Sequence, residues 1–294
     1  MTQSKKAIGL VGAGLMGSGI AASLLRNGYP LLILEHEGNQ PLQPLMAAGA
    51  ATCASVSTLA AQSDIVILCV TGTPQVEAVL FGDDGVLKGL RPGATVIDCS
   101  TAIPASTVRI AQAVRQAGGR FLDAAMTRTP KEAAEGRLNL IVGAADEDFQ
   151  ACLPVMQAYA ENIVHAGPVG AGHQMKLLHN YVSLGFSAIL AEAAACARRV
   201  GADPHVFCQV LAAGGGAGVV LERLRPYIEQ GDTSGFRFSM SNAHKDLDYY
   251  CTMVEQLGGA HAVAEAVRTL YQQANTAGLA QAPVPQLIDH LSVS

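Results

Sequence analysis

A glycine-rich turn near the N-terminus constrains the fold of this chain more than any other feature. Residues 7–12 form an apolar, strand-like run, and a helical stretch follows the turn directly. The turn itself reads Gly12, Ala13, Gly14, Leu15, Met16 and Gly17. In this context the first glycine permits a tight turn, the second lets backbone N–H groups approach a pyrophosphate, and the third lets the helix pack closely on the strand. The turn therefore predicts a dinucleotide-binding unit whose cofactor contacts these six residues; the alternative is a glycine-rich turn in another α/β fold.

The same uncharged run, residues 7–25 after Lys5 and Lys6, could pass for a signal peptide or a membrane span. Its five glycines argue against both, because glycine in a helix interior costs up to about 1 kcal/mol relative to alanine. We therefore expect no membrane segment at this end of the chain.

Short apolar runs alternate with helical stretches over the first half of the chain. The runs cover residues 7–12, 31–35, 64–70, 94–100, 120–126 and 139–144. Their apolar positions are consecutive, as in strands covered on both faces, and the alternation indicates parallel β-α-β units. Later segments read as helices at 174–200, 206–211, 221–228 and 247–257. We expect an α/β fold with a Rossmann-type doubly wound parallel sheet over residues 1–167, followed by an all-α domain over residues 168–294.

An acidic residue is expected about twenty residues after such a turn, where it accepts hydrogen bonds from the ribose hydroxyls. Glu35 ends the second strand-like run, and His36 and Glu37 follow it in place of an arginine. A 2′-phosphate would meet negative charge there, so NAD is favoured over NADP as the cofactor. Val70 and Thr71, at the end of the third run, are further candidate cofactor contacts.

A polar stretch from Asp98 to Thr101 ends the fourth strand-like run, where open α/β sheets bind ligands. Thr101 is therefore a candidate contact for cofactor and substrate. The alternative is structural, because Thr101 or Ser106 could cap a helix over residues 108–114. The stretch alone leaves both readings open.

The long helix over residues 174–197 carries one polar stripe on an otherwise apolar surface. The members of the stripe are Lys176, His179, Asn180, Ser183 and Ser187. A solvent-facing side is the ordinary explanation, but apolar residues all round predict a buried helix whose stripe lines a cleft. Lys176 can then act as general acid and base on a substrate hydroxyl, while Asn180 holds the lysine or the substrate oxygen. His179 and Ser183 are candidate substrate contacts.

The patterns of charge, cysteine and histidine narrow the possible partners. The formal net charge is −5 without a basic cluster, so we expect a small-molecule substrate, no nucleic acid and no anionic membrane surface. The seven cysteines form no C-x-x-C pair, which favours a reducing cytoplasm and no disulfides. The eight histidines show no ligand spacing, so we expect no metal.

Four motifs spread over nearly the whole chain occur together. They are the glycine turn, D-x-S-T at 98–101, G-x-G-x-x-x-K-x-x-x-N at 170–180, and Lys245-Asp246-Leu247. Together they resemble the β-hydroxyacid dehydrogenase family, which includes 3-hydroxyisobutyrate dehydrogenases and tartronate semialdehyde reductases. The resemblance implies a Rossmann domain followed by a helical domain often used for dimerisation, so we expect a homodimer or homotetramer.

The resemblance also implies roles for single residues. The lysine that matches Lys176 is catalytic in the family, and the asparagine that matches Asn180 assists it. Thr101 matches a position near the nicotinamide. Phe238 and Asp246 match positions close to the active site, where they are candidate substrate contacts, and Lys245 is a candidate cofactor contact.

One segment departs from the family pattern, and it should select the substrate. The family usually has D-A-P-V-S-G-G, whose serine and glycine amides hold the substrate carboxylate, whereas residues 123–129 read D-A-A-M-T-R-T. Thr127 can replace the serine hydroxyl, and Arg128 replaces a glycine with a permanent cation that suits an oxyanion. The 3-sulfolactaldehyde reductases of the family have a similar run, in which the arginine helps bind the sulfonate, although His179 stands where they have asparagine. The alternative is an outward-turned Arg128 paired with an acid such as Glu132.

These observations predict NAD-dependent interconversion of a small 3-hydroxy acid, or a sulfonate analogue, with its semialdehyde, with Lys176 as general acid and base. Three alternatives stay open. The first is a 3-sulfolactaldehyde reductase-like enzyme that uses Arg128 for the anion. The second is an imine reductase-like enzyme, although these generally lack the lysine matched by Lys176. The third is a non-catalytic dinucleotide-binding protein.

Overall fold

Eight strands form one sheet in the computed structural model, which describes residues 5–293. The strands are β1 (Ile8–Val11), β2 (Leu31–Leu34), β3 (Ala51–Cys53), β4 (Ile65–Leu68), β5 (Thr95–Asp98), β6 (Arg120–Thr127), β7 (Leu138–Gly143) and β8 (Ala160–Gly167). Their order is β3-β2-β1-β4-β5-β6-β7-β8, and every neighbouring pair is parallel except the antiparallel pair β6 and β7. The predicted Rossmann-type α/β fold is confirmed, and all six predicted strands are present.

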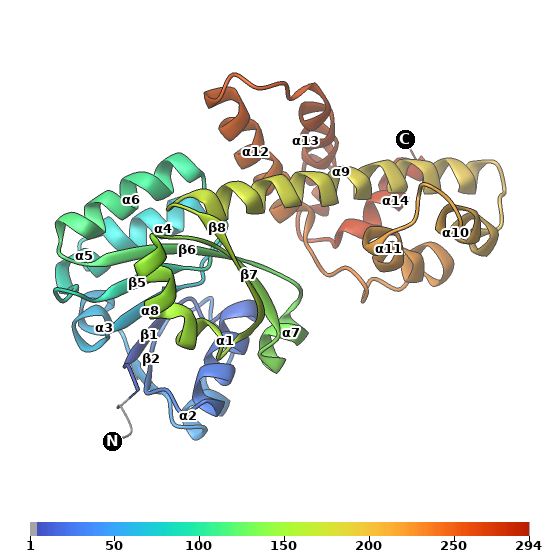
Figure 1. Cartoon of the computed structure of the whole chain (residues 1–294). Coiled ribbons are helices and arrows are strands. Elements are labelled where there is room, and N and C mark those ends of the chain that lie inside the picture. The colour runs from blue at the N-terminus through green and yellow to red at the C-terminus, as the bar shows by residue number, and fades with distance from the viewer. Residues whose placement is uncertain (1–4, 294) are drawn as a thin grey trace. The chain divides into compact units, whose positions relative to one another are not determined.

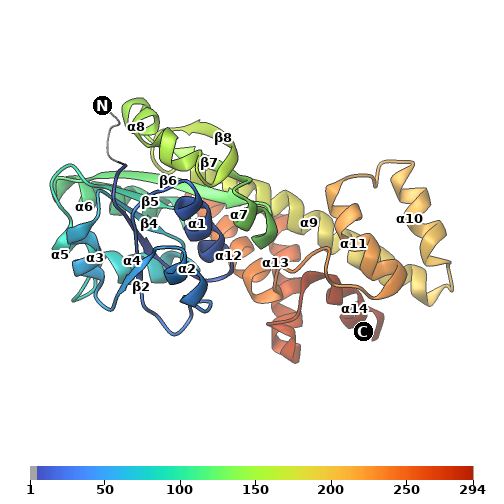
Figure 2. The same ribbon diagram turned by 90° about the horizontal axis from the view of Figure 1, so that it is seen from below.

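Helices cover both faces of the sheet because alternate strand residues point to opposite sides. In β4, Ile65 and Ile67 belong to one buried core, whereas Val66 and Leu68 belong to another. The first core includes residues of α1 (Leu15–Arg26), α2 (Gln43–Ala47), α7 (Pro130–Glu135) and α8 (Asp146–Met156). The second includes residues of α3 (Val56–Gln62), α4 (Thr73–Phe81), α5 (Val86–Gly89) and α6 (Pro104–Gln116). Figures 1 and 2 show α8 and α3 on opposite sides of the sheet.

The chain divides into two compact units, one up to Lys176 and the other from Leu177 onward. The second unit is helical throughout its described part. It contains most of α9 (Ala171–Arg199), α10 (Pro204–Ala212), α11 (Val219–Gln230), α12 (Met240–Gln256), α13 (Ala262–Ala274), the short η1 (Asn275–Leu279) and η2 (Val284–Gln286), and α14 (Leu287–Val293). The all-α character predicted for the C-terminal half is confirmed. The domain boundary after residue 167 stays a prediction.

Helix α9 is a core helix of the second unit along one side only. Leu184, Ala188 and Ala191 belong to that unit's buried core. By length and apolar composition α9 could cross a membrane, but half of its most apolar window is buried inside the protein, and a core helix passes the same test.

The prediction that α9 is buried all round apart from its polar stripe is wrong. Leu178, Val182 and Ile189 are exposed, because only the opposite side of the helix packs on the core. Ser187, a predicted member of the cleft-lining stripe, is fully buried and donates a hydrogen bond to the carbonyl of Ser183 at 2.8 Å. The polar stripe therefore contains partly exposed residues, such as Lys176, as well as buried ones, such as Ser187.

The alternative reading, in which Thr101 or Ser106 caps the helix after β5, does not hold. α6 begins at Pro104, and its N-cap residue is Ile103, which makes no side-chain cap. Ser106 lies inside the helix and donates to the Glu77 carboxylate at 2.5 Å. Proline at the first helical position needs no partner for a backbone N–H, so the helix starts without help from Thr101.

Candidate active site

The glycine turn after β1 has the geometry that a close-lying pyrophosphate requires. Gly12 has a φ of +96°, in the left-handed region that favours glycine. A Cβ on Gly17 would lie 1.9 Å from the Gly12 carbonyl oxygen, so α1 can approach β1 only without a side chain there. A Cβ on Gly14 would meet nothing within 4 Å, which leaves open space over the N-terminus of α1. The residues present therefore fit a dinucleotide.

The residues around the start of α1 differ in their surroundings. Ala13 is fully buried, and its N–H donates to the Asn39 side-chain oxygen at 3.1 Å. Leu15 is exposed, whereas Met16 packs partly against the core. The N–H groups at the start of a helix have no partner within the helix, so this turn presents donors to an anion.

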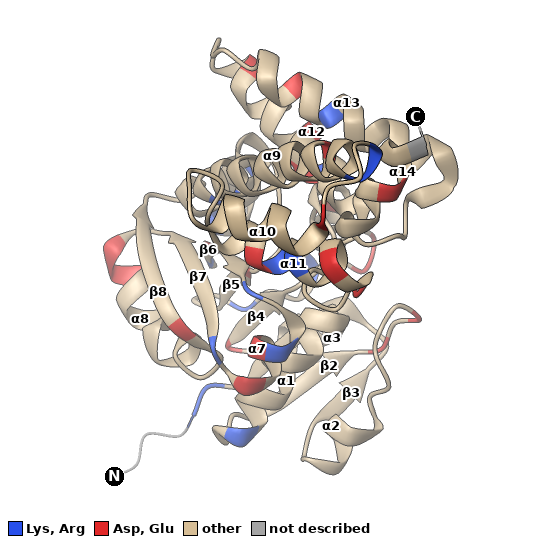
Figure 3. Cartoon of the chain, turned by 90° about the vertical axis from the view of Figure 1, so that its right-hand side faces the viewer, with Lys and Arg blue, Asp and Glu red and all other residues tan. Residues whose placement is uncertain are grey.

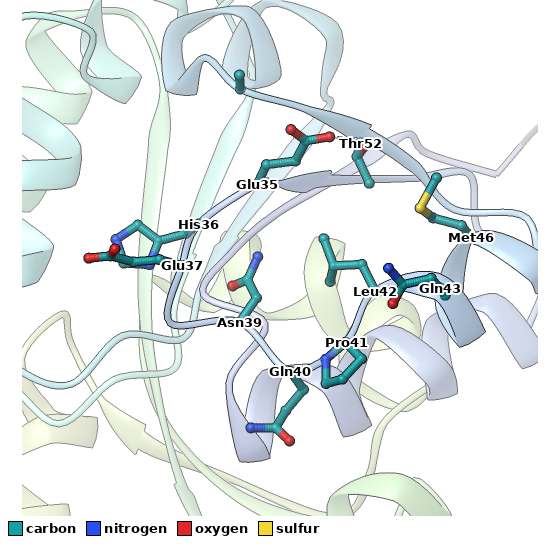
Figure 4. A pocket seen from close by; sticks show the side chains of 11 residues that line it. Glu35, His36, Glu37, Asn39, Gln40, Pro41, Leu42, Gln43, Met46 and Thr52 are labelled. Atoms are coloured by element: carbon teal, nitrogen blue, oxygen red, sulfur yellow. Dashed lines mark hydrogen bonds between the residues drawn. The ribbon is translucent and has the colours of Figure 1, made fainter.

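A hollow of about 570 Å³ lies beyond the end of β2, and its lining residue Asn39 accepts the N–H of Ala13 in the glycine turn. Its lining residues include Glu35, His36, Glu37 and Thr52, and none of them is a lysine or an arginine. Figure 4 shows the Glu35 carboxylate turned toward Thr52, whose hydroxyl donates to it at 2.6 Å. The acid predicted to meet the ribose is thus held at the rim of a hollow that is lined by no lysine or arginine.

The loops after β4 and β5 are tied together. The N–H of Val70 donates to the Ser100 hydroxyl at 3.0 Å, and the N–H of Ser100 donates to the Asp98 carboxylate at 2.9 Å. Thr71 and Thr101 are neighbours of these residues in the chain. The structure therefore brings the segments that carry three of the predicted cofactor and substrate contacts, Val70, Thr71 and Thr101, to the carboxyl ends of adjacent strands, where such sheets bind ligands.

Lys176 lies in the first unit and is the sixth residue of α9, which starts at Ala171. Its side-chain nitrogen donates to the Met126 carbonyl at 2.6 Å, and the side chain is partly exposed. Met126 precedes Thr127 and Arg128 at the end of β6. The candidate general acid and base is thus anchored at the segment that departs from the family pattern.

Arg128 has a φ of +83° and is the one described residue besides glycine in the left-handed region. Its Nη1 group donates to the Glu161 carboxylate and to the Arg137 carbonyl. The bond from Arg128 lowers the pKa of Glu161. The Thr127 hydroxyl accepts a bond from the Asn139 amide at 3.1 Å.

The predicted partner of an outward-turned Arg128 was Glu132, and the structure corrects this. Glu132 instead accepts bonds from the N–H and the hydroxyl of Thr129, which forms a capping box at the start of α7. Glu161 reaches Arg128 because β8 pairs with β7, next to β6 in the sheet. A pairing across neighbouring strands has no spacing signal in the sequence.

The second unit holds the other predicted polar residues in one linked group. The Asn180 amide donates to the buried Asp246 carboxylate at 2.6 Å, and Lys245 forms an ion pair with Asp246 at 3.1 Å. His179 lies on the other side of Asn180, with its Nδ1 atom 2.9 Å from the Asn180 side-chain oxygen. Phe238 packs partly on the core of this unit.

Two buried residues of the first unit were not predicted. Asp123 and His173 are completely buried, and the Asp123 carboxylate accepts the backbone N–H groups of Gly170 and His173 at 2.7 and 2.8 Å. Asp123 is the first residue of the segment that departs from the family pattern. Because aspartate is also the family's residue there, its identity alone did not indicate a special role.

One group of side chains could hold a metal ion within the described part of the chain. Glu255, His261 and Glu265 place ligand atoms within 4.8 Å of one another at the junction of α12 and α13. Glu265 is already paired with Arg268 at 2.8 Å. The expectation of no metal stays a prediction.

Comparisons with known proteins cover both units. The family model described as the NAD binding domain of 6-phosphogluconate dehydrogenase matches residues 7–167, and the one described as NAD-binding of NADP-dependent 3-hydroxyisobutyrate dehydrogenase matches residues 170–291. The chain is 33% identical to 2-hydroxy-3-oxopropionate reductase of Escherichia coli (strain K12), over 82% of each chain. It is 31% identical to 3-sulfolactaldehyde reductase of the same organism, over 82% of this chain and 80% of that one. A crystal structure of 3-hydroxyisobutyrate dehydrogenase from Salmonella typhimurium matches with a TM-score of 0.85 and 28% identity, covering 97% of this chain and 99% of that chain.

Proposed function

Because this chain belongs to the β-hydroxyacid dehydrogenase family, we propose that it interconverts a small anionic 3-hydroxy acid and its semialdehyde, with NAD as the cofactor. Family membership makes it an NAD(P)-dependent oxidoreductase that acts on the CH–OH group of a small hydroxy acid. The observation that carries the finer proposal is the 2.6 Å bond from Lys176 to the Met126 carbonyl, beside Thr127 and Arg128.

Lys176 acts as general base during oxidation and as general acid during reduction. Its unprotonated amine takes the proton of the substrate hydroxyl, and its ammonium form returns that proton to the aldehyde oxygen. The nicotinamide, when bound, supplies the acceptor or donor of the hydride. The Met126 carbonyl holds the side chain in place by accepting one of its N–H bonds.

Asn180 assists from the next turn of α9, four residues along the same helix face. Asp246 accepts a bond from the Asn180 amide, and this fixes the amide plane so that it can hold the reacting oxygen. The ion pair with Lys245 compensates the charge of Asp246, a carboxylate that is only 2% exposed.

NAD is the proposed cofactor in preference to NADP. Glu35 and Glu37 line the hollow beyond β2, and no lysine or arginine is among its lining residues. A 2′-phosphate at this place would face the carboxylate that Thr52 holds in position. A ribose with both hydroxyls free can instead donate hydrogen bonds to Glu35.

Arg128 and Thr127 are proposed to hold the anionic end of the substrate. The bonds to Glu161 and Arg137 use only the Nη1 group of Arg128 among the described residues. The remaining guanidinium donors suit a carboxylate or a sulfonate. A guanidinium at this point is the specific observation that favours the second candidate function, reduction of a sulfonated aldehyde.

A substitution of Lys176 tests the proposed reaction. Lys176→Ala should reduce turnover by about two orders of magnitude or more, as expected for loss of an acid-base group, while NADH still binds. The measurement is a turnover panel with 3-hydroxyisobutyrate, glycerate, threonate and 2,3-dihydroxypropanesulfonate, together with NADH titration. Lys88→Ala, at an exposed lysine of α5, is the matched control. Full turnover by the Lys176 variant would remove the residue from the mechanism.

The same panel separates the other candidate functions. Activity on cyclic imines with none on hydroxy acids would identify an imine reductase. Tight NADH binding with no turnover of any hydroxy acid or aldehyde would identify a non-catalytic dinucleotide-binding protein.

We further propose that the enzyme works in a reducing cytoplasm on a small molecule. All seven cysteines are free thiols. Figure 3 shows Lys and Arg residues interspersed with Asp and Glu residues along the ribbon. A nucleic acid or an anionic membrane would be bound through a continuous basic surface.

A further inference from the structure

A buried carboxylate holds the first turn of α9 to the sheet. Asp123, on β6, accepts the N–H of Gly170 with one oxygen and the N–H of His173 with the other. The first N–H groups of a helix have no partner within it, and a carboxylate at this end is favoured by the helix dipole. Asp123 therefore acts as an N-terminal cap supplied by a strand about fifty residues earlier in the chain.

The glycines of the G-x-G-x-x-x-K motif make room for this cap. Gly170 has a φ of +95°, which lets the chain turn into the helix. A Cβ on Gly172 would lie 2.8 Å from the Asp123 carboxylate, and a Cβ on Gly143 of β7 would lie 2.5 Å from it. Two glycines from different elements thus leave space for one carboxylate, and the motif is a docking device for the helix that carries Lys176.

His173 connects the same turn to two further elements. Its Nδ1 atom lies 2.7 Å from the Thr107 hydroxyl of α6. Its Nε2 atom lies 4.0 Å from an oxygen of Asp98 at the end of β5. These two facing atoms are buried and form no hydrogen bond with any described residue. A histidine and a carboxylate that are buried together in this way attract each other electrostatically.

The other oxygen of Asp98 continues the connection toward the cofactor side. It accepts the N–H of Ser100, whose hydroxyl accepts the N–H of Val70. Burial raises the pKa of the Asp98 carboxyl, and His173 opposes that rise. The loops after β4 and β5 are thereby joined, through Asp98 and His173, to the first turn of α9.

Lys176 follows His173 by three residues and therefore lies on the same side of the helix, one turn along. Its nitrogen contacts Met126, three residues after Asp123 on β6. The cap and the lysine contact are thus two attachments of one helix turn to one strand. A helix held at both points cannot rotate or slide without moving the amine.

We propose that Asp123 and His173 are positioning residues for Lys176: Asp123 fixes the first turn of α9 on β6, and His173 sets that turn relative to the loop that carries Ser100 and Thr101. This inference rests on the proposed role of Lys176. Neither residue touches the substrate, because both are completely buried.

Three substitutions test the positioning role. Asp123→Asn keeps the side-chain shape, but only its one remaining oxygen can accept a backbone N–H. His173→Leu removes the contacts of both ring nitrogens. His173→Gln keeps a polar side chain at this position. Asp123→Asn and His173→Leu should lower kcat about 10- to 100-fold, as expected when a catalytic group is displaced by about 1 Å. The pH limb of kcat/KM that reports Lys176 should move by about half a unit or more in both variants, and NADH affinity should be unchanged in Asp123→Asn. His173→Gln should restore most of the activity.

Leu59→Ala, at a buried core residue of α3, is the control for destabilisation alone, since it leaves a cavity without touching the network. It should lower Tm but leave the pH limb in place. Two further measurements do not depend on turnover: hydrogen exchange of residues 170–176, and NMR titration of the dimethylated Lys176 amine in the NADH complex. Both should change in Asp123→Asn and His173→Leu and not in Leu59→Ala.

The outcomes separate this inference from the proposed function. No turnover of any panel compound by the unaltered protein would overturn the proposed function, while exchange and amine titration would still decide the positioning role. Unchanged exchange and an unchanged amine pKa in Asp123→Asn and His173→Leu would overturn the positioning role. So would a His173→Gln variant as impaired as His173→Leu.

Discussion

Arg128 combines a strained backbone with a charged side chain. Substitutions can separate the effect of the backbone on stability from the effect of the guanidinium on substrate binding. A left-handed conformation costs an L-residue about 1–2 kcal/mol, whereas a half-exposed ion pair such as that with Glu161 contributes about 0–1 kcal/mol. Arg128→Gly should therefore melt at the same temperature as the unaltered protein or slightly higher. It should also raise KM for the preferred anionic substrate, because the guanidinium is lost.

Arg128→Ala is the control for this pair of effects, because it removes the guanidinium but keeps the strain. It should be about 1 kcal/mol less stable than Arg128→Gly, with a similar KM. Thermal melting and steady-state kinetics measure both quantities. An unchanged KM in both variants would assign Arg128 to structure alone.

A second prediction concerns the choice of cofactor and the roles of Glu35 and Thr52 in it. Glu35→Ala should weaken NADH binding by about tenfold or more, since hydrogen bonds to a charged group are worth about 1.5–3 kcal/mol, and should weaken NADPH binding less. Thr52→Val removes the hydroxyl that holds the carboxylate at 2.6 Å and should produce a smaller loss in the same direction. Fluorescence titration with both cofactors measures the effect, and equal losses for NADH and NADPH would contradict it.

At the scale of elements, Asp84 stabilises the start of α3 in a pH-dependent way. Its carboxylate accepts the N–H groups of Val56 and Ser57 and the hydroxyls of Ser55 and Ser57. The Ser57 hydroxyl and these other donors lower the pKa of Asp84 from 3.8 to about 2. A depressed pKa stabilises the fold above the unfolded value, and the contribution disappears as the pH falls through the folded value.

Asp84→Asn should therefore lower Tm at neutral pH, and the gap to the unaltered protein should narrow as the pH falls from about 4 toward about 2. Asp83→Asn, at the neighbouring and fully exposed carboxylate, should show no such narrowing. Melting curves at neutral and acidic pH measure the difference. A gap that stays constant over this range would mean that the charge of Asp84 does not stabilise α3.

Elements with a continuous apolar pattern could be predicted from the sequence, and elements without one could not. The six predicted strands are apolar at consecutive positions, as two-sided burial requires. β3 has three residues and offers almost no pattern, and Glu161, Asn162 and His165 interrupt the apolar positions of β8. The second unit shows the same contrast, since α9 is long and apolar whereas α13 was not predicted.

At the scale of the whole molecule, the sequence predicted which residues carry the chemistry but not what holds them. Lys176 and the glycine turn stand in motifs whose spacing can be read along the chain. The contacts of Asp123 with Gly170 and His173 span 47 and 50 residues, and no local pattern indicates them. The ion pair of Arg128 with Glu161 spans 33 residues, because it depends on the order of β6, β7 and β8.

The last prediction concerns the surface through which the expected homodimer or homotetramer would form. Val182 and Ile189 on α9 and Val206 and Val210 on α10 are all more than half exposed, although α9 also supplies the core of its unit. Exposed apolar side chains gathered on one unit are typical of surfaces that another chain covers. Val182→Asp places a charge on this apolar side of α9, where burial against a second copy would be costly.

This variant should therefore shift the protein toward the monomer, with light scattering coupled to size exclusion as the measurement. Phe81→Asp, at an exposed apolar residue of α4 in the first unit, should leave the molecular mass unchanged. A monomeric unaltered protein would contradict the expectation of an oligomer. An oligomer that both substitutions leave intact would place its interface away from this side of α9.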